Sequence, residues 1–369
     1  MKLNFLVVIC FAVLCTILTL GLWPFHSPQN AVTWLANRNG LRFSSNSTVF
    51  SFHPFPLMSP NDSPAVSVEV WLRPRRIWDS GTFFAFYRPE TLSLLSLRQS
   101  ETDSFISTEI YGKRVLFCVD NDFRRGLPSF LTVTSDGQEV CVYIDGVLAK
   151  KHLHLPLSAR DFSGRLVVGD SPRQPDSWSG QLLGIAIYHH QLTAAEAFQN
   201  YTSWKQNGRP ETAGKDTISL YLFDEHRGRI IRDKAGSGVD LYIPERYQVL
   251  DKTALQPFWS EFEMSRSYWG AAFKNIVGFV PFGFCFYAYL AMLLPTKRAT
   301  LITVALGTLV SLTIEVLQVF LPTRDSGTSD IITNTLGTCI GVLVYRLLTP
   351  KLARLFPWLW KGIRSMRSH

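Results

Sequence analysis

The sequence predicts a multi-domain protein that combines an all-β sandwich with an α-helical transmembrane bundle of four spans. The length of 369 residues suggests two or three domains. Four apolar stretches each approach the roughly 20 residues that cross a bilayer core, and they cover residues 4–23, 273–294, 300–321 and 331–348. Between the first two stretches, residues 31–254 alternate apolar and polar positions, as strands of a soluble domain do.

The first apolar stretch predicts an N-terminal transmembrane helix within residues 1–24. Lys2 precedes the apolar run, as it also would in a cleaved signal peptide, so that alternative stays open. The run is about 19 residues long, more than the roughly 7 to 15 residues of a signal-peptide core. The segment "WPFHSPQN" after it offers no small-x-small cleavage site. We therefore expect an uncleaved anchor.

Positive charge in the short loops predicts the orientation, because Lys and Arg are retained on the cytoplasmic side. The loop "PTKRAT" carries Lys297 and Arg298, and residues 351–369 form a basic tail. Both termini are then cytoplasmic, while the sandwich and the loop "PTRDSGTSD" are extracytoplasmic. Trp358 and Trp360 in the tail suit an interfacial helix on anionic lipid. The net charge of +8 thus favours membrane lipids over nucleic acid as partners.

Residues 31–245 predict the sandwich, since short strand-like runs alternate there with turn signals. The run "VSVEVWLRP" at 66–74 places Val and Leu on one face and polar or aromatic residues on the other. Asp-Gly at 136–137 and at 145–146 is the dipeptide that tight hairpin turns favour. We expect two consecutive hairpins at these positions.

Four segments resemble the laminin-G or concanavalin-A-like jelly roll, in the chain order "VSVEVWLRP", "FLTVTSDGQEVCVYIDGVLA", "GRLVVGD" and "WSGQLLGIAIYHHQLTAAEAFQNY". The resemblance covers roughly residues 38–243. The last segment is the most specific, because such domains often have a Trp-x-Gly turn, a final strand and a short helix. Thr193 would cap that helix, and Glu196 would complete a capping box. The resemblance implies a module that binds a glycan or a protein, since the fold hosts both.

The sandwich sequence lacks the closely spaced carboxylates of a jelly-roll glucanase, so a binding module is favoured over an enzyme. Glu69 stands alone in its strand and is expected at the surface. Trp178 or Tyr188, if exposed, could stack on a sugar, although packing is the commoner fate of such residues. Cys118 and Cys141 could form a disulfide, and two free thiols are the alternative. Neither a metal nor a cofactor is expected.

Residues 246–272 form a juxtamembrane segment that is rich in aromatic side chains. These are Phe258, Trp259, Phe262, Tyr268 and Trp269. Aromatic rings gather at membrane interfaces, so the segment predicts an aromatic belt at the outer surface of the bilayer.

The bundle contains polar residues that the predicted topology brings to one membrane face. They are Asn275, Glu315, Gln318, Arg324, Asp330 and Asn334. A carboxylate within a span costs several kcal/mol unless it finds a partner, and Arg324 is expected to fold back toward Glu315. Two interpretations stay open: a ligand-binding cluster, or a network that only ties the helices together.

The same residues carry a second resemblance. The segments "NIVGFVPFG" at 275–283, "SLTIEVLQVFLPTR" at 311–324 and "SDIITNTLGTCIGVLV" at 329–344 are similar in order and spacing to the VanZ family. The resemblance covers about residues 265–350, with a three-helix region at 273–350 and the N-terminal span as the first helix. It implies a bacterial inner-membrane protein. One member of the family is linked to low-level resistance to the glycopeptide teicoplanin, and the family has no settled biochemical activity.

Proline and glycine within the predicted spans are interpreted as architectural. Pro281 frees a backbone carbonyl and bends a helix, and Gly283 follows it by two residues. Gly337 and Gly341 have the small-xxx-small spacing that permits close helix contact.

These features predict a cell-envelope membrane protein. Its polar cluster would engage a headgroup of a lipid-linked wall or polysaccharide precursor, and its jelly roll would bind glycan. Two alternatives remain: a membrane enzyme on a lipid-linked substrate with Glu315 as general base, and an adhesion or scaffold protein for which the bundle is only an anchor.

Overall fold

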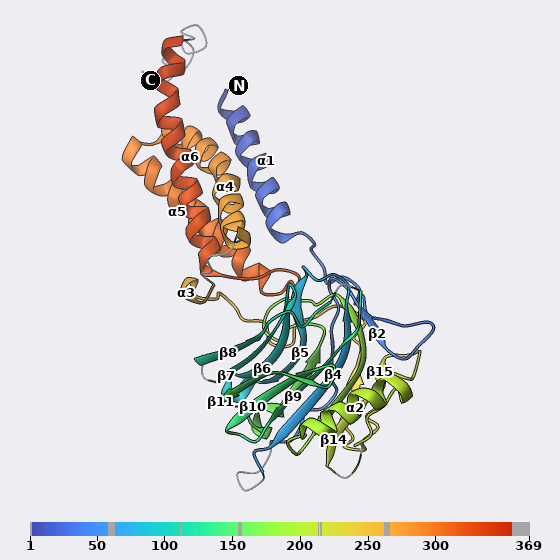
Figure 1. Cartoon of the computed structure of the whole chain (residues 1–369). Coiled ribbons are helices and arrows are strands. Elements are labelled where there is room, and N and C mark those ends of the chain that lie inside the picture. Colours follow the sequence, from blue (N-terminus) through green and yellow to red (C-terminus); the bar gives the residue numbers. More distant parts are fainter. Residues whose placement is uncertain are drawn as a thin grey trace. The chain divides into compact units, whose positions relative to one another are not determined.

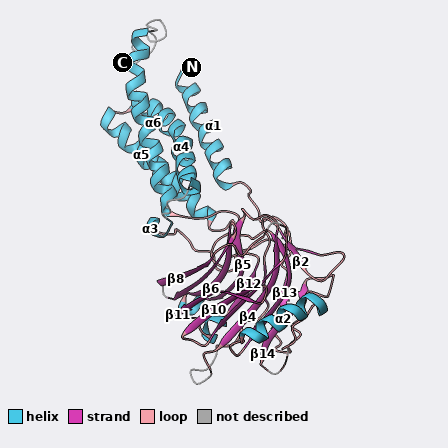
Figure 2. Ribbon diagram, viewed as in Figure 1, coloured by secondary structure: helices cyan, strands magenta, loops and turns pink. Residues whose placement is uncertain are grey.

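The computed structural model describes residues 2–57, 63–110, 113–124, 126–153, 157–212, 214, 216–261 and 266–355. The chain divides into two compact units, Ser27–Lys252 and a second one made of Met1–His26 with Thr253–His369. The first unit is built of strands and the second of helices (Figures 1 and 2). The expected fold class, an all-β sandwich plus a helical bundle, is confirmed.

Two eight-stranded antiparallel sheets form the sandwich. The first sheet has the order β1-β2-β13-β4-β9-β10-β11, with β14 also pairing with β13. Its strands are β1 Thr33–Trp34, β2 Leu41–Phe43, β4 Val66–Pro74, β9 Ser129–Ser135, β10 Glu139–Ile144, β11 Val147–Leu153, β13 Gly180–Tyr188 and β14 Thr217–Tyr221.

The second sheet has the order β15-β16-β3-β12-β5-β6-β7-β8. Its strands are β3 Val49–Ser51, β5 Ser80–Arg88, β6 Ser93–Ser100, β7 Asp103–Ile110, β8 Lys113–Val119, β12 Arg165–Val168, β15 Ile230–Ile231 and β16 Leu241–Tyr242. Two short 3-10 helices, η1 Pro89–Thr91 and η2 Ala159–Phe162, complete the unit with α2 Ala194–Asn207.

Strand β4 explains how the layers pack. Its even-numbered apolar residues, Val66 to Leu72, are at most 1% exposed and face the core between the sheets. The opposite face of β4 carries Glu69 and Trp71, and Trp71 packs against Trp204 of α2. Both faces of the strand are therefore covered, one by the second sheet and one by the helix.

The local signals at the turns and at the helix are confirmed. Thr193 caps α2, and the reciprocal bonds with Glu196 form the capping box. Both Asp145 and Gly146 have positive φ angles, of 51° and 77°, in the turn between β10 and β11, as a tight hairpin requires. In the turn between β9 and β10, Gly137 has a φ of 90°.

The helical unit contains α1 Lys2–Leu22, α3 Phe258–Glu261, α4 Arg266–Leu293, α5 Thr296–Gln318 and α6 Thr328–Leu355. Within the described residues, four of these helices are long and apolar enough to cross a bilayer, namely α1, α4, α5 and α6. The chain is accordingly a membrane protein. Phe258 and Trp259 of α3 and Trp269 at the start of α4 are exposed. Phe262 of the predicted belt, and Trp358 and Trp360 of the tail, lie outside the described residues.

Glycines bring α4 and α6 into close contact. A Cβ on Gly337 would overlap the carbonyl oxygen of Ile276, and one on Gly341 would overlap that of Val280. On the α4 side of the same contact, a Cβ on Gly283 would overlap the carbonyl oxygen of Thr338 in α6. The α4 helix continues through Pro281. The small residues therefore set the separation of these two helices.

Helices α1 and α5 run in one direction, and helices α4 and α6 run in the opposite direction. Gln318, at the C-terminal end of α5, donates to the carbonyl of Gly21 at the end of α1, at 2.9 Å. Gly337 and Ile276 join the first half of α6 to the first half of α4. The ends of α1 and α5 and the starts of α4 and α6 thus lie together, and we call this the loop end of the bundle. It includes the connection 319–327.

Candidate functional site

Glu315 lies near the end of α5 and contacts the loop between α5 and α6 through both its side chain and its backbone. Its side chain is 1% exposed, and its Oε2 accepts the backbone N–H of Gly327 at 2.8 Å. The hydroxyl of Ser326 donates to the backbone carbonyl of Glu315 at 2.9 Å. Gln256 holds the same loop, because it receives the N–H of Thr328 on its carbonyl and donates its own N–H to the Ser326 carbonyl. The connection between α5 and α6 is thus folded over the carboxylate.

Arg324 was expected to fold back toward Glu315, but it contacts the end of α1 instead. Its Nε donates to the carbonyl of Trp23 at 2.8 Å, and its Nη2 donates to that of Leu20 at 3.1 Å. The last carbonyls of a helix lack intrahelical partners and carry the negative end of the helix dipole. The carbonyls at the end of α1 therefore bind the guanidinium group of Arg324. The sequence of α5 and its loop could not predict this contact, because α1 lies about 300 residues earlier in the chain.

The other predicted residues divide among separate contacts. Asn334 is 5% exposed and donates its Nδ2 to Ser311 Oγ at 2.9 Å, one turn before Glu315. Its Oδ1 is buried without a hydrogen-bond partner among the described residues. Asn275 in α4 is half-buried, and Asp330 lies in the first turn of α6. The structure joins Asn334 to the Ser311 face of α5, and Gln318 and Arg324 to the end of α1.

Glu69 was expected at the surface, and the structure corrects this. The carboxylate is fully buried between β4 and α2. It accepts three hydrogen bonds, from Tyr188 Oη at 2.8 Å, Asn200 Nδ2 at 2.9 Å and Trp204 Nε1 at 3.2 Å. Burial raises the pKa of Glu69 to about 7, and the three donors oppose that rise. A single strand pattern could not reveal the helix that covers it.

The two aromatic candidates for sugar stacking are wrong, because both side chains are fully buried. Trp178 donates its Nε1 to Gln99 Oε1 at 2.7 Å inside the sandwich. Tyr188 donates to Glu69 beneath α2. Neither ring presents a face to a ligand, and each buried polar atom is satisfied within the domain.

The disulfide alternative is also wrong, since Cys118 and Cys141 are free thiols. Cys118 belongs to β8 of the second sheet and Cys141 to β10 of the first. Burial raises the pKa of Cys141 to about 11. Atoms of Asp103, Cys118 and Asp120 lie within 4.8 Å of one another and could hold a metal ion, but Lys150 already lies 3.5 Å from the Asp120 carboxylate.

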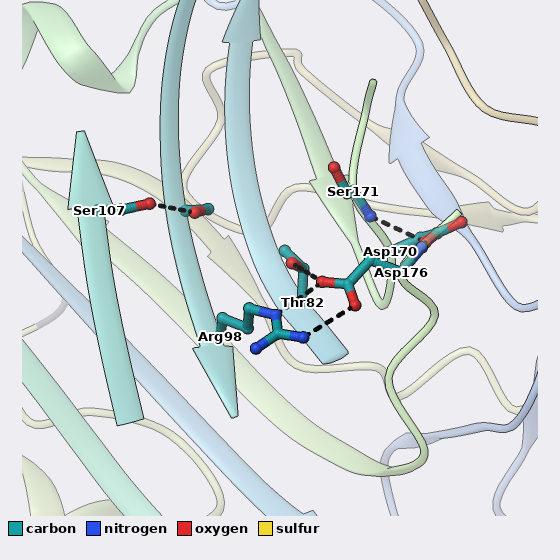
Figure 3. Close-up of polar contacts among 7 residues, drawn as sticks. Thr82, Arg98, Ser107, Asp170, Ser171 and Asp176 are labelled. Carbon is teal, nitrogen blue, oxygen red and sulfur yellow. Dashed lines mark hydrogen bonds and ion pairs between the residues drawn. The ribbon is translucent and has the colours of Figure 1, made fainter. Parts of the chain in front are cut away.

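The outer face of the second sheet carries a polar cluster that the sequence pattern does not reveal. The Asp176 carboxylate accepts Thr82 Oγ1 at 2.6 Å and forms an ion pair with Arg98 at 3.0 Å. On the neighbouring strands, the hydroxyls of Ser96 and Ser107 lie 2.7 Å apart. Figure 3 shows Thr82 and Arg98 directed at Asp176, with Ser107 on the adjacent strand.

A second ion pair borders the two serines. Arg173, in the same loop as Asp176, contacts Glu109 at 3.0 Å. The loop is fixed by Asp170, whose Oδ1 accepts the N–H groups of Ser171 and Asp176 at 2.9 and 2.8 Å. Burial raises the pKa of Asp170 to about 7. We call this set the second-sheet polar patch; its members are Thr82, Ser96, Arg98, Ser107, Glu109, Arg173 and Asp176.

Two known families match separate parts of the chain. Residues 217–349 match the VanZ/LLP1 family, and residues 44–198 match the concanavalin A-like lectin/glucanases superfamily. The chain joins a VanZ/LLP1 region to a concanavalin A-like domain. The VanZ/LLP1 match begins at residue 217, inside β14, and so earlier than residue 265 where the resemblance was expected to begin. No curated protein matches the chain.

Solved structures similar to the chain include a SAP-like pentraxin from Limulus polyphemus, with 13% identity, a TM-score of 0.39, and coverage of 58% of this chain and 99% of that one. A putative carbohydrate binding protein from Bacteroides ovatus has 12% identity, a TM-score of 0.40 and coverage of 55% and 57%. The receptor binding domain of botulinum neurotoxin D has 14% identity, a TM-score of 0.37 and coverage of 47% and 46%. The chain therefore spans about half the length of the last two.

The matched ranges contain both candidate sites. The second-sheet polar patch, from Thr82 to Asp176, lies in the concanavalin A-like domain. The polar residues of the bundle, from Asn275 to Asn334, lie in the VanZ/LLP1 region.

Proposed function

We propose that this protein is a bacterial cell-envelope protein whose extracytoplasmic sandwich binds glycan, and whose VanZ/LLP1 region engages the headgroup of a lipid-linked ligand. The observation that carries the glycan part is the second-sheet polar patch. Its hydroxyls, carboxylates and guanidinium groups are donors and acceptors of the kind that sugar hydroxyls bind. The patch lies on the outer face of the sheet opposite to the one that α2 covers.

The four ionic side chains of the patch are partly open to a ligand. The exposed side-chain fractions are 34% for Arg98 and 19% for Asp176 in one ion pair, and 25% for Arg173 and 20% for Glu109 in the other. The serines between them form a small, hydrogen-bonded floor. Fixed polar groups above such a floor can orient a sugar ring without rearrangement of the sheet.

The loop end of the bundle supports the headgroup part. Glu315 is held by a backbone N–H of its own loop, and Asn334 places a second polar group one turn away through Ser311. The orientation from Lys297 and Arg298 puts this end on the outer side, with both chain termini in the cytoplasm. A headgroup at that side would meet polar atoms of α5 and α6. The membrane is then the bacterial inner membrane.

Binding to a glycan array tests the sandwich, with the full chain in nanodiscs of zwitterionic lipid. Arg98→Gln and Ser107→Ala should each weaken the binding, because each removes one donor of the patch. Ser219→Ala is the matched control, since Ser219 also pairs its hydroxyl with a serine, Ser237, at 3.2 Å. Failure of every glycan to bind, or equal binding by Arg98→Gln and wild type, would overturn the proposal for the sandwich.

Glu315→Gln tests the bundle separately. The amide keeps an oxygen for the Gly327 N–H, so folding should be retained while the charge is lost. We expect the envelope phenotype, measured as susceptibility to teicoplanin in cells lacking the native protein, to be lost with Glu315→Gln and kept with the exposed control Glu90→Gln. A Glu315→Gln protein with the full phenotype contradicts this role.

A further inference from the structure

A row of basic side chains crosses the outer face of the first sheet, at the opposite side of the sandwich from the second-sheet polar patch. Arg42 of β2 is in register with Gln181 of β13, and Gln181 is in register with Arg73 of β4. Residues in register on adjacent strands lie about 5 Å apart and point to the same face. The two arginines therefore flank a glutamine across three adjacent strands.

Arg38 adds a third cation above the centre of the row. It lies in the hairpin loop between β1 and β2, and its Nη2 donates to Gln181 Oε1. Arg38 and Arg42 are exposed, and Arg73 is half-buried. The loop that follows β8 borders Arg73, because a Cβ on Gly126 would lie 4.0 Å from its Nη2. That loop carries the exposed Arg124 two residues earlier.

No acidic side chain among the described residues forms an ion pair with Arg38, Arg42 or Arg73. This contrasts with Arg98 and Arg173 on the other sheet, which both have carboxylate partners. Burial, and next the charge of Arg73, lower the pKa of Arg38. The charges of Arg38 and Arg73 thus repel one another within the folded domain, and a bound anion would relieve that repulsion.

The spacing of the row favours an extended anion. The backbones of Arg42 and Arg73 are two strands apart, about 10 Å, so with Arg38 the three arginines form an extended row of positive charge on the surface of the sheet. A chain with a negative group on successive units can contact both, and the planar fork of arginine suits carboxylate and phosphate oxygens. On the same face of β4, Glu69 and Trp71 lie against α2. Arg73 is half-buried there, and Arg38 and Arg42 beside it are exposed.

We propose that Arg38, Arg42 and Arg73 bind an anionic polysaccharide that carries carboxylate or phosphate groups along its length. This site is separate from the second-sheet polar patch and does not depend on the function proposed for that patch. It gives the sandwich a second, charge-selective surface.

The test uses the full chain in phosphatidylcholine nanodiscs, with polygalacturonate oligomers as the probe and neutral dextran oligomers of the same length as the comparison. The wild type should bind polygalacturonate and not dextran at this site, and the binding should weaken as NaCl is raised. The double variant Arg42→Gln/Arg73→Gln should weaken it about tenfold or more, since two charge-assisted contacts are lost.

The double variant Arg160→Gln/Arg227→Gln is the matched control. It removes the same net charge from exposed positions elsewhere on the domain, and it should bind polygalacturonate as the wild type does. Equal loss in both double variants would show attraction by net charge alone and would overturn the proposal. Unchanged binding in Arg42→Gln/Arg73→Gln, or no binding to polygalacturonate together with binding to phosphatidylglycerol vesicles, would do so as well. Glycan-array results for Arg98→Gln report on the other face, so failure of either proposal can be recognised by itself.

Discussion

Two glutamates, Glu69 in the sandwich and Glu315 in the bundle, are buried to the same degree but in different ways. Glu69 accepts from three side chains, two of them on α2 and one on β13. Glu315 accepts from the backbone of Gly327 in the loop that follows its own helix. A carboxylate held by side chains of packed elements is part of the core. The Glu315 carboxylate instead joins the end of α5 to the loop that follows it.

The two glutamates also differ in what their replacement would leave behind. Removing Glu69 would leave donors of the sandwich unsatisfied, whereas replacing Glu315 by its amide would preserve the loop contact. The hypothesis that Glu315 has a functional role therefore rests on the difference between a network of core side chains and a contact with a loop, and not on burial alone. Four predictions test that difference.

The largest effect is expected for Glu69→Ala. The change leaves the donors of Tyr188, Asn200 and Trp204 buried without an acceptor, and it should lower the free energy of unfolding of the sandwich by about 3 to 5 kcal/mol. Thermal or urea unfolding of the purified protein, followed by tryptophan fluorescence, measures it. Glu69→Gln keeps one acceptor oxygen and should cost less. A loss below 1 kcal/mol for Glu69→Ala would show that Glu69 is not a core residue.

The next effect is on pH dependence. The pKa of Glu69 is raised from 4.5 to about 7 in the folded protein, so between these values the folded state holds a proton that the unfolded chain has released. Raising the pH through this window therefore favours unfolding, by up to about 3 kcal/mol. Glu69→Gln removes this contribution, so its stability relative to the wild type should increase from pH 4.5 to pH 7. Parallel stability curves for the two proteins would contradict the assignment.

Glu315→Ala should have a smaller effect on stability than Glu69→Ala. It removes the acceptor of the Gly327 N–H, and a buried donor left without its acceptor costs about 1 to 3 kcal/mol. The thermal midpoint of the bundle in nanodiscs should fall, and Glu315→Gln should restore most of it. If the alanine variant were as damaging as Glu69→Ala, Glu315 would be a core residue of the same kind.

Tyr188→Phe should have the smallest effect, about 1 kcal/mol, because Glu69 keeps two of its three donors. Tyr201→Phe is the matched control, because Tyr201 is a half-buried tyrosine of α2 that packs against Phe130 of the sheet. We expect no measurable change for the control. Equal losses in the two variants would contradict a specific contribution of the hydrogen bond from Tyr188 to Glu69.

The hydrophobic pattern and the turn chemistry were enough to predict the two kinds of architecture. The apolar stretches correspond to α1, α4, α5 and α6, although α4 begins at Arg266 and α5 at Thr296, before the apolar runs start. The capping box at Thr193 and the Asp-Gly turn at 145–146 were predicted in place. These features form between residues that are close in the sequence, so a short sequence pattern is enough to predict them.

The sequence by itself thus determined the spans, the sandwich and the polar character of the loop end. Only the tertiary structure decided which polar groups meet. It placed Arg324 on the carbonyls of α1, buried Glu69 and Tyr188 beneath α2, and assembled Arg42, Gln181 and Arg73 from three strands. The reason is physical. Periodicity fixes the face on which a side chain lies, but the partner across that face comes from a distant part of the chain.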